Sequence, residues 1–160
     1  MPYATVQDLI DRFGERELVE LTDPAELAAV DAARVQLKLD DAHALADGYL
    51  ARVYALPLTG CVKPVGVGIT ELVPPPQLTR IVCDLARYYL YDDLAPEAEV
   101  YRRFKAACAE LQAIADGTQR LVCPWGGEPG SPTAIGPAAG DTWAEFRPRA
   151  ITPDVDEGYR

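Results

Sequence analysis

The sequence has few of the residues on which catalysis and nucleic-acid binding depend. Among 160 residues there is one histidine, and 15 lysines and arginines stand against 25 acidic residues, which leaves a formal net charge of -10. Binding to phosphate backbones or to anionic lipid needs clustered cationic side chains. The composition therefore argues against a nucleic-acid reader and against a membrane-surface protein.

Long apolar runs are also missing. No stretch of about 18 apolar residues is present that could span a membrane, and the N-terminus lacks the basic region and apolar run of a secretory signal. We therefore expect synthesis in the cytosol and no contact with a membrane. Hydrophobic residues make up 49% of the chain, which is enough to build the core of one domain.

The four cysteines do not form a metal-binding pattern. Cys61, Cys83, Cys108 and Cys123 are widely spaced, without a C-x-x-C pair and without a nearby histidine to complete a zinc site. Cys83 and Cys108 lie among apolar residues at helical spacing, where a reduced cysteine serves as a small core residue. The sequence predicts neither a metal nor a cofactor.

Candidate catalytic groups are sparse as well. His43 is the only histidine, and no G-x-S-x-G elbow or reactive-cysteine signature accompanies it. Gly66-Val67-Gly68 lacks the third glycine and the lysine of a nucleotide loop, and Asp92-Asp93 is typical of a solvated helix end. We predict no catalytic residues and a protein that is not an enzyme.

Helical periodicity is the strongest local signal. Val6, Leu9, Ile10 and Phe13 share one helical face, and they are preceded by Thr5 as a possible cap and followed by Gly14 as a possible end. Similar patterns predict further helices over residues 15–21, 31–54, 77–91 and 97–115.

One β-hairpin interrupts the helical pattern. Two short β-branched runs, 61–65 and 69–73, flank Gly66-Val67-Gly68, and prolines bracket them. A hairpin of this size is too small to stand alone, so it should lean on the helices or on another subunit. The predicted fold is mainly α: a small helical bundle of about four to five helices over residues 1–121, with a hairpin insertion at about 60–73.

The last part of the chain has a different composition. Residues 122–160 are rich in proline, glycine, serine and threonine, which predicts an extended C-terminal arm. Four aromatic residues are spread along it, and aromatic rings gain nothing from solvent. We therefore expect the arm to lie on a protein surface and predict these interface residues: Trp125, Trp143, Phe146 and Tyr159.

Several segments, in a fixed order, resemble a protein family encoded by Mu-like phages and prophages. They are residues 3–14 (YATVQDLIDRFG), 49–58 (YLARVYALPL), 73–78 (VPPPQL) with 83–91 (CDLARYYLY), and 102–117. The resemblance covers about residues 2–121, and no catalytic motif comes with it. The hairpin and the residues beyond 122 do not match the pattern.

The resemblance implies a structural virion protein, similar to the helical head-tail connectors of the phage neck. Such connectors form a ring beneath the portal, usually of twelve subunits. The partners implied are other copies of the chain, the portal protein, and a tail-terminator or other neck protein. Genomic DNA would pass through without sequence-specific binding, helped by acidic walls that repel phosphate. The implied location is the virion neck, after assembly in the host cytoplasm.

Two alternatives remain open at the level of sequence. A tail-completion or tail-terminator subunit would also form rings but would dock on the tail tube. A helical interaction module unrelated to phages would need no ring. Predicted helical rather than β-sandwich content favours the connector.

Overall fold

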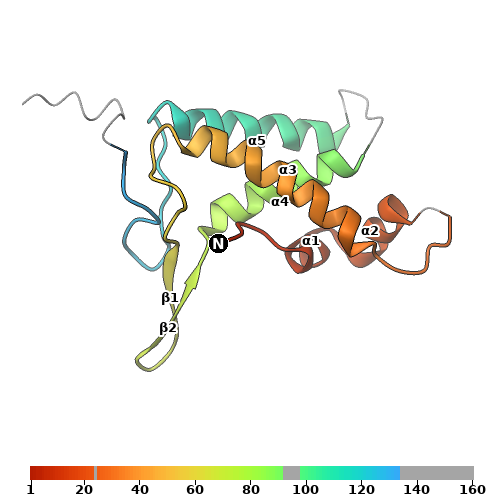
Figure 1. Cartoon of the computed structure of the whole chain (residues 1–160), viewed down its shortest axis with the longest axis horizontal. Helices are drawn as coiled ribbons and strands as arrows, with labels where there is room; N and C mark the ends of the chain where they lie inside the picture. Colours follow the sequence, from red (N-terminus) through yellow and green to blue (C-terminus); the bar gives the residue numbers. More distant parts are fainter. Residues whose placement is uncertain (24, 92–97, 134–160) are drawn as a thin grey trace, which may run out of the picture.

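Residues 1–23, 25–91 and 98–133 are described by the structure, a computed structural model of the chain. Within them the fold is mainly α, with one two-stranded antiparallel sheet (Figure 1). Both features confirm the sequence-based prediction. In chain order the elements are α1 (Val6–Phe13), α2 (Glu15–Thr22), α3 (Ala32–Leu50), β1 (Cys61–Gly66), β2 (Ile69–Val73), α4 (Pro76–Leu90) and α5 (Glu99–Ala115).

Helix α1 begins and ends where its sequence predicts. The hydroxyl of Thr5 accepts a hydrogen bond from the backbone N–H of Asp8, whose carboxylate in turn accepts one from the backbone N–H of Thr5. This capping box satisfies two backbone donors of the first turn. Gly14 ends the helix with φ +88°, a conformation that favours glycine, and α2 starts at the next residue.

An ion pair fastens α2 to α4. The guanidinium of Arg87 donates two hydrogen bonds to the carboxylate of Glu17, of 2.6 and 3.0 Å, and it also stacks 4.5 Å from the ring centre of Phe13. Because the pair is bidentate and mostly buried, it sets the position of the two short helices against the rest of the protein.

Helix α3 ends four residues before its predicted end. Asp31 caps its start by accepting hydrogen bonds from the backbone N–H groups of Ala33 and Arg34. The predicted extension to residue 54 is wrong, because Tyr54 leaves the helix and forms an antiparallel bridge with Pro132. Contacts with a distant part of the chain therefore override the local periodicity.

Helix α4 is the most buried element. Nine of its 15 residues are buried, and it packs against both α3 and α5. Of the predicted inward positions, Leu78, Ile81, Val82 and Leu85 are fully buried, whereas Tyr89 is half-buried. The bounds of α4 agree with the prediction to within one residue.

Helix α5 covers α4 with a mixed aliphatic and aromatic face. Ala107, Leu111 and Ile114 are fully buried, and the ring of Phe104 stacks on that of Tyr88 with 4.0 Å between centres. Residue 97, where this helix was predicted to start, lies outside the described residues.

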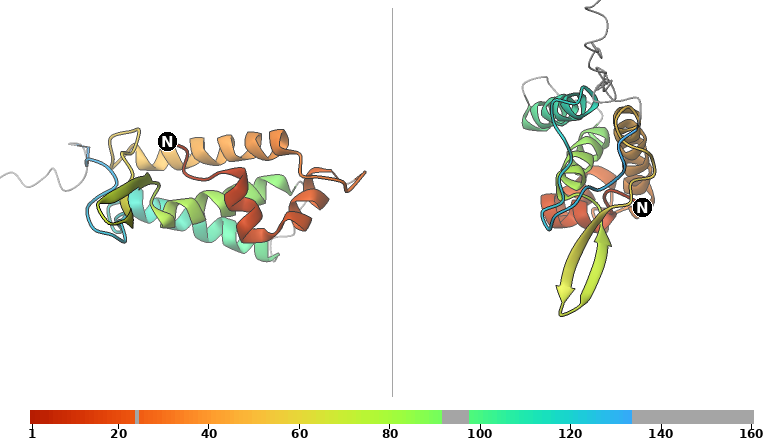
Figure 2. Two further views of the ribbon diagram at one scale, coloured as in Figure 1. Left: turned by 90° about the horizontal axis from the view of Figure 1, so that it is seen from below. Right: turned by 90° about the vertical axis from the view of Figure 1, so that its left-hand side faces the viewer.

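The hairpin projects away from the helical body. Figures 1 and 2 show it at one end of the long axis, while the connection between α2 and α3 lies at the other end. Of the helices described, none is both long and apolar enough to cross a membrane. The protein is thus a helical body with a protruding, two-stranded extension.

Candidate subunit interface

The hairpin has no core of its own. Its strands pair with Cys61 opposite Val73 and Val62 opposite Leu72, and a bulge follows Pro64. All strand residues are exposed except Cys61, which is buried, and Val73, which is half-buried. Since a two-stranded sheet needs further packing to be stable, the hairpin depends on contacts at its base and on protein segments that pack against its faces.

The two faces of the hairpin have different environments. Successive strand residues point to opposite faces, so Val62 and Leu72 share one face while Lys63 and Glu71 share the other. The Lys63 face is turned toward the segment around Trp125, whose ring centre lies 5.8 Å from the Lys63 ammonium. No segment among residues 1–23, 25–91 and 98–133 covers the Val62 face in this way, and the side chains of Val62 and Leu72 are more than half exposed.

Residues 121–133 return to the body and support the hairpin base. The backbone N–H groups of Ala55, Gly60 and Thr133 form hydrogen bonds across this junction, donating respectively to the carbonyls of Ser131, Pro129 and Val53. Thus the described part of the predicted arm, residues 122–133, is fastened to the chain that leads into β1. The rest of the arm lies outside the described residues, and the proposed domain boundary at residue 121 stays a prediction.

A disulfide reinforces this junction. Cys61, the first residue of β1, is bonded to Cys123, and both are buried. The sequence analysis missed this pair because the two cysteines are 62 residues apart and no local pattern links them. The bond fixes the hairpin base next to the segment that carries Trp125.

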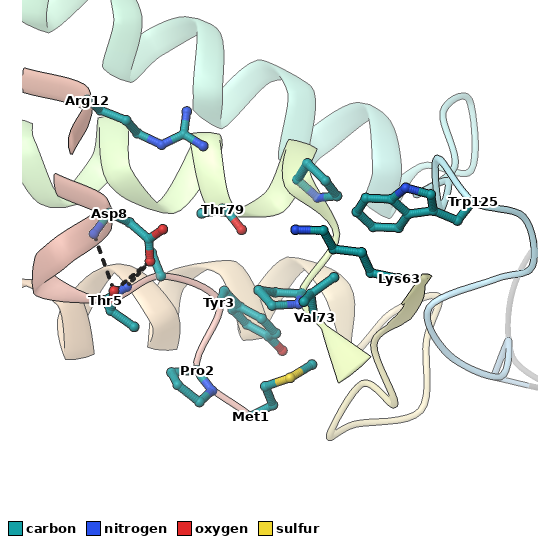
Figure 3. Close-up of a pocket in the computed structure, with 13 residues that line it drawn as sticks. Met1, Pro2, Tyr3, Thr5, Asp8, Arg12, Lys63, Val73, Thr79 and Trp125 are labelled. Carbon is teal, nitrogen blue, oxygen red and sulfur yellow. Dashed lines mark hydrogen bonds between the residues drawn. The ribbon is translucent and has the colours of Figure 1, made fainter. Parts of the chain in front are cut away.

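Trp125 lies at a groove between the hairpin base, the N-terminal segment and α4. The groove has a volume of about 380 Å³ and a largely apolar wall, which Figure 3 shows from the side. Lys63 and Trp125 lie near one end, and Arg12 and Asp8 line the other. Trp125 itself is 40% exposed, and its role in an interface stays a prediction. The other predicted interface residues, Trp143, Phe146 and Tyr159, lie outside the described residues.

Gly60 permits the close approach that closes this groove. It adopts φ +91°, and a side chain there would collide with the terminal methyl of Met1 and approach the Val73 carbonyl oxygen to 3.0 Å. The positive φ favours glycine at this position, and the nearby Val73 carbonyl leaves little room for a side chain.

His43 holds the N-terminal segment in place. Its Nε2 accepts a hydrogen bond of 3.2 Å from the backbone N–H of Ala4, and its ring packs edge-on against Tyr3. The Tyr3 hydroxyl donates to the carboxylate of Asp47, one turn along α3. Burial lowers the pKa of His43, opposed by the nearby carboxylates of Asp40 and Asp47, and burial raises the pKa of Tyr3. His43 therefore packs on Tyr3 and binds the backbone of Ala4.

The two unpaired cysteines are placed in the helical core or at its edge. Cys83 is fully buried on α4, and burial raises the pKa of its thiol to about 12. Cys108 is half-buried on α5, and burial raises its pKa as well. Since the reactive form of cysteine is the thiolate, burial disfavours reaction at both thiols, and most strongly at Cys83.

Acidic residues do not gather into an ion site in the described part of the chain. No group of three or more histidine, cysteine or acidic side chains there could hold a metal ion. Asp84, the one buried carboxylate of α4, lies 3.6 Å from Arg80 and 3.8 Å from Arg103. Burial raises the pKa of Asp84, and the two arginines oppose that shift. Asp92 and Asp93 lie outside the described residues.

Comparison with known proteins identifies the family. The family model described as Bacteriophage Mu, Gp36 matches residues 3–135. The chain belongs to this family. Gene product J of Escherichia phage Mu is 33% identical over 118 residues, covering 73% of this chain and 74% of that protein. The Mu-like prophage FluMu protein gp36 of Haemophilus influenzae is 30% identical over 119 residues, 74% of either chain.

The family match confirms the predicted resemblance to Mu-like phage and prophage proteins. It spans the helical body and Trp125, and it also includes the hairpin, which the resemblance seen in the sequence did not cover. It ends at residue 135, before Trp143, Phe146 and Tyr159. Among the predicted interface residues, Trp125 alone belongs both to the described structure and to the family match.

Proposed function

We propose that this Mu Gp36 family protein is a structural component of the phage particle that joins head to tail as a ring in the neck. The observation that carries the proposal is the protruding hairpin, on which Val62, Val65, Val67, Ile69 and Leu72 are each at least half exposed on a protein of net charge -10. Large exposed apolar patches are typical of surfaces that contact another protein. Membership of a Mu phage family supports a role in the particle.

The partners in this proposal are other copies of the chain, the portal protein and a tail-terminator or other neck protein. We propose a dodecamer, which would surround a channel for genomic DNA. With 25 acidic and 15 basic residues, the subunits would repel the phosphate backbone, so that a duplex could move through without sequence-specific contacts.

The role we propose is structural rather than catalytic. The single histidine accepts a backbone hydrogen bond and packs on Tyr3, and burial keeps the Cys83 thiol protonated. The imidazole of His43 and the thiol of Cys83 are thus used to build the fold.

To test this function, the gene for the protein is deleted from the phage or prophage and supplied again from a plasmid. Electron microscopy then shows the particles formed with and without the plasmid copy. The proposal predicts filled heads and separate tails of normal length, which the plasmid copy rejoins. Tails of abnormal length would instead indicate a tail-terminator subunit. Intact infectious particles without the gene would contradict any role in the particle.

The substitution His43→Gln provides the control for catalysis. It retains a hydrogen-bonding side chain but removes the imidazole, so the plasmid copy with this change should still rejoin heads and tails. Loss of rejoining by a variant that folds normally would contradict a purely structural role.

A further inference from the structure

The groove beside Trp125, here called the Trp125 groove, combines aromatic rings with prolines. The N-terminal segment, α1, the hairpin base and α4 supply its walls, and its volume of about 380 Å³ is within the range of ligand-binding pockets. Walls of this composition are typical of grooves that bind an extended, proline-containing chain. The rings and prolines of the wall are Tyr3, Trp125, Pro2, Pro74 and Pro76.

The Trp125 groove is basic on an acidic protein. Its charged side chains are those of Lys63, Arg12 and Asp8, whereas the whole chain carries 25 acidic and 15 basic residues. The carboxylate of Asp8 already accepts hydrogen bonds from the backbone N–H and the hydroxyl of Thr5 (Figure 3). Glu71 lies opposite Lys63 in the hairpin but is not one of the residues that line the groove. A segment that binds there should therefore carry negative charge.

One stretch near the C-terminus has this composition. Residues 150–158 read Ala-Ile-Thr-Pro-Asp-Val-Asp-Glu-Gly, with one proline, three acidic residues and no basic residue. By contrast, residues 134–140 carry no charged side chain, and in residues 141–149 two acidic residues are balanced by two arginines. Charge complementarity therefore selects residues 150–158, which lie outside the described residues, among the segments that follow residue 133.

The described chain ends on a different side of the body from the groove. The backbone N–H of Thr133 donates to the carbonyl of Val53, just after α3, and no residue of α3 lines the groove. Figures 1 and 2 show the last described stretch, in blue, running from the hairpin base toward α3. This direction leads away from the groove of the same subunit.

The intervening chain is long enough to reach a second subunit. Fully extended, the 17 residues from 134 to 150 span at most about 56 Å. The 19-residue helix α3 is only about 28 Å long. The acidic stretch can therefore extend well beyond its own helical body.

We propose that residues 151–157 of one subunit lie in the Trp125 groove of the next copy of the chain. This inference rests on the proposed ring and names a contact between its neighbouring subunits. Pro153 would pack on the ring of Trp125, and the acidic residues after it would lie beside Lys63, whose ammonium is 5.8 Å from the centre of that ring. Because the segment and the groove are different surfaces, the contact is head-to-tail, and such contacts close into rings when the rotation between subunits permits.

Photo-crosslinking of the full-length protein tests this contact directly. We would place p-benzoylphenylalanine at position 155, between two of the acidic residues, and mix this chain with wild type labelled with nitrogen-15. Mass spectrometry then separates links to the labelled chain from links within one chain. The inference predicts links to labelled peptides that contain residues 1–12, Lys63 or Trp125. Links within one chain only, links to other surfaces, or no link at protein concentrations up to about 1 mM would overturn it.

Neutralising single charges tests the electrostatic part of the contact. Lys63→Gln should lower the yield of the crosslink by about threefold, whereas the matched control Lys105→Gln, on α5 and away from the groove, should leave it unchanged. The yield should also fall between about 50 and about 500 mM salt, because exposed charges are screened. A yield that responds to neither Lys63→Gln nor salt would overturn the proposed role of charge.

A mixture of two variants tests the head-to-tail order. The segment variant Asp154→Asn/Asp156→Asn/Glu157→Gln keeps an intact groove, and Lys63→Gln keeps an intact segment. With the photoreactive residue at position 155 of Lys63→Gln, the inference predicts more crosslinking to the segment variant than to a second Lys63→Gln chain, by about threefold. Equal crosslinking to both chains would overturn the inference.

The plasmid complementation separates failure of this contact from failure of the neck function. The segment variant should rejoin heads and tails less well than the control Asp141→Asn/Glu145→Gln. Full rejoining by a segment variant that no longer crosslinks would refute the contact but leave the neck function intact. Particles that never need the gene would refute the neck function itself.

Discussion

Leu85 provides the sharpest test of the helical packing. It lies on α4, which packs against both α3 and α5, and its side chain is fully buried. Replacing a buried leucine by alanine removes its transfer free energy and leaves a cavity, at a cost of about 2 to 5 kcal/mol. Because α4 is enclosed by two other helices, the site has little freedom to collapse, and we expect about 3 kcal/mol or more.

Urea denaturation and thermal denaturation, both followed by circular dichroism, measure this cost. At about 2 to 4 °C per kcal/mol for a chain of this size, the thermal midpoint of Leu85→Ala should fall by roughly 6 to 12 °C. The slope of the unfolding free energy against urea concentration should stay the same, since the surface area exposed on unfolding hardly changes.

The matched control is Leu37→Ala, which makes the same chemical change at a side chain that is 58% exposed. It should alter the unfolding free energy by no more than about 0.5 kcal/mol in dilute protein. Equal midpoints for wild type and Leu85→Ala would refute the packing of α4 described above.

Three further predictions follow from the junction and the N-terminal segment. In protein purified without reductant and then denatured, alkylation should modify two of the four cysteines, Cys83 and Cys108, and four reactive thiols would contradict the disulfide. The double variant Cys61→Ser/Cys123→Ser should have an unfolding free energy lower by about 2 to 4 kcal/mol. The folded state lowers the pKa of His43, so its contribution to stability is complete above the unfolded pKa of about 6.5 and is lost as the pH falls below it. The difference in unfolding free energy between wild type and His43→Gln, measured in urea, should therefore shrink from pH 8 to pH 5. A difference independent of pH would count against the Ala4 contact. Truncation after Thr133 keeps every described contact, so the urea midpoint should not change. The truncated chain should nevertheless fail to join heads and tails. Particles that assemble normally with it would show that Trp143, Phe146 and Tyr159 are dispensable.

The helices could be predicted from the sequence because their signals are local. The apolar positions of α1 and α4 recur at helical spacing, and Thr5 and Gly14 provide the start and end of α1 within a few residues. The hairpin could also be predicted from local signals, since prolines bracket its strands and glycines flank its turn. In each case the physical cause lies within the segment itself.

Features that depend on distant partners could not be predicted in this way. The end of α3 is decided by pairing of Tyr54 with Pro132, and the base of the hairpin by the bond between Cys61 and Cys123. Neither partner can be found from periodicity, because each lies more than 60 residues away.

The candidate interface was predicted only in part. Composition pointed to Trp125 but not to Lys63 beside it, and nothing in the sequence signalled the positive φ of Leu27. A leucine at positive φ looks like any other leucine in a sequence.

Electron cryomicroscopy of the particle neck tests the central claim most directly. The account predicts twelve copies of the helical body around the DNA channel between portal and tail. Density for this protein only at the tail tube, or its absence from the finished particle, would contradict the account.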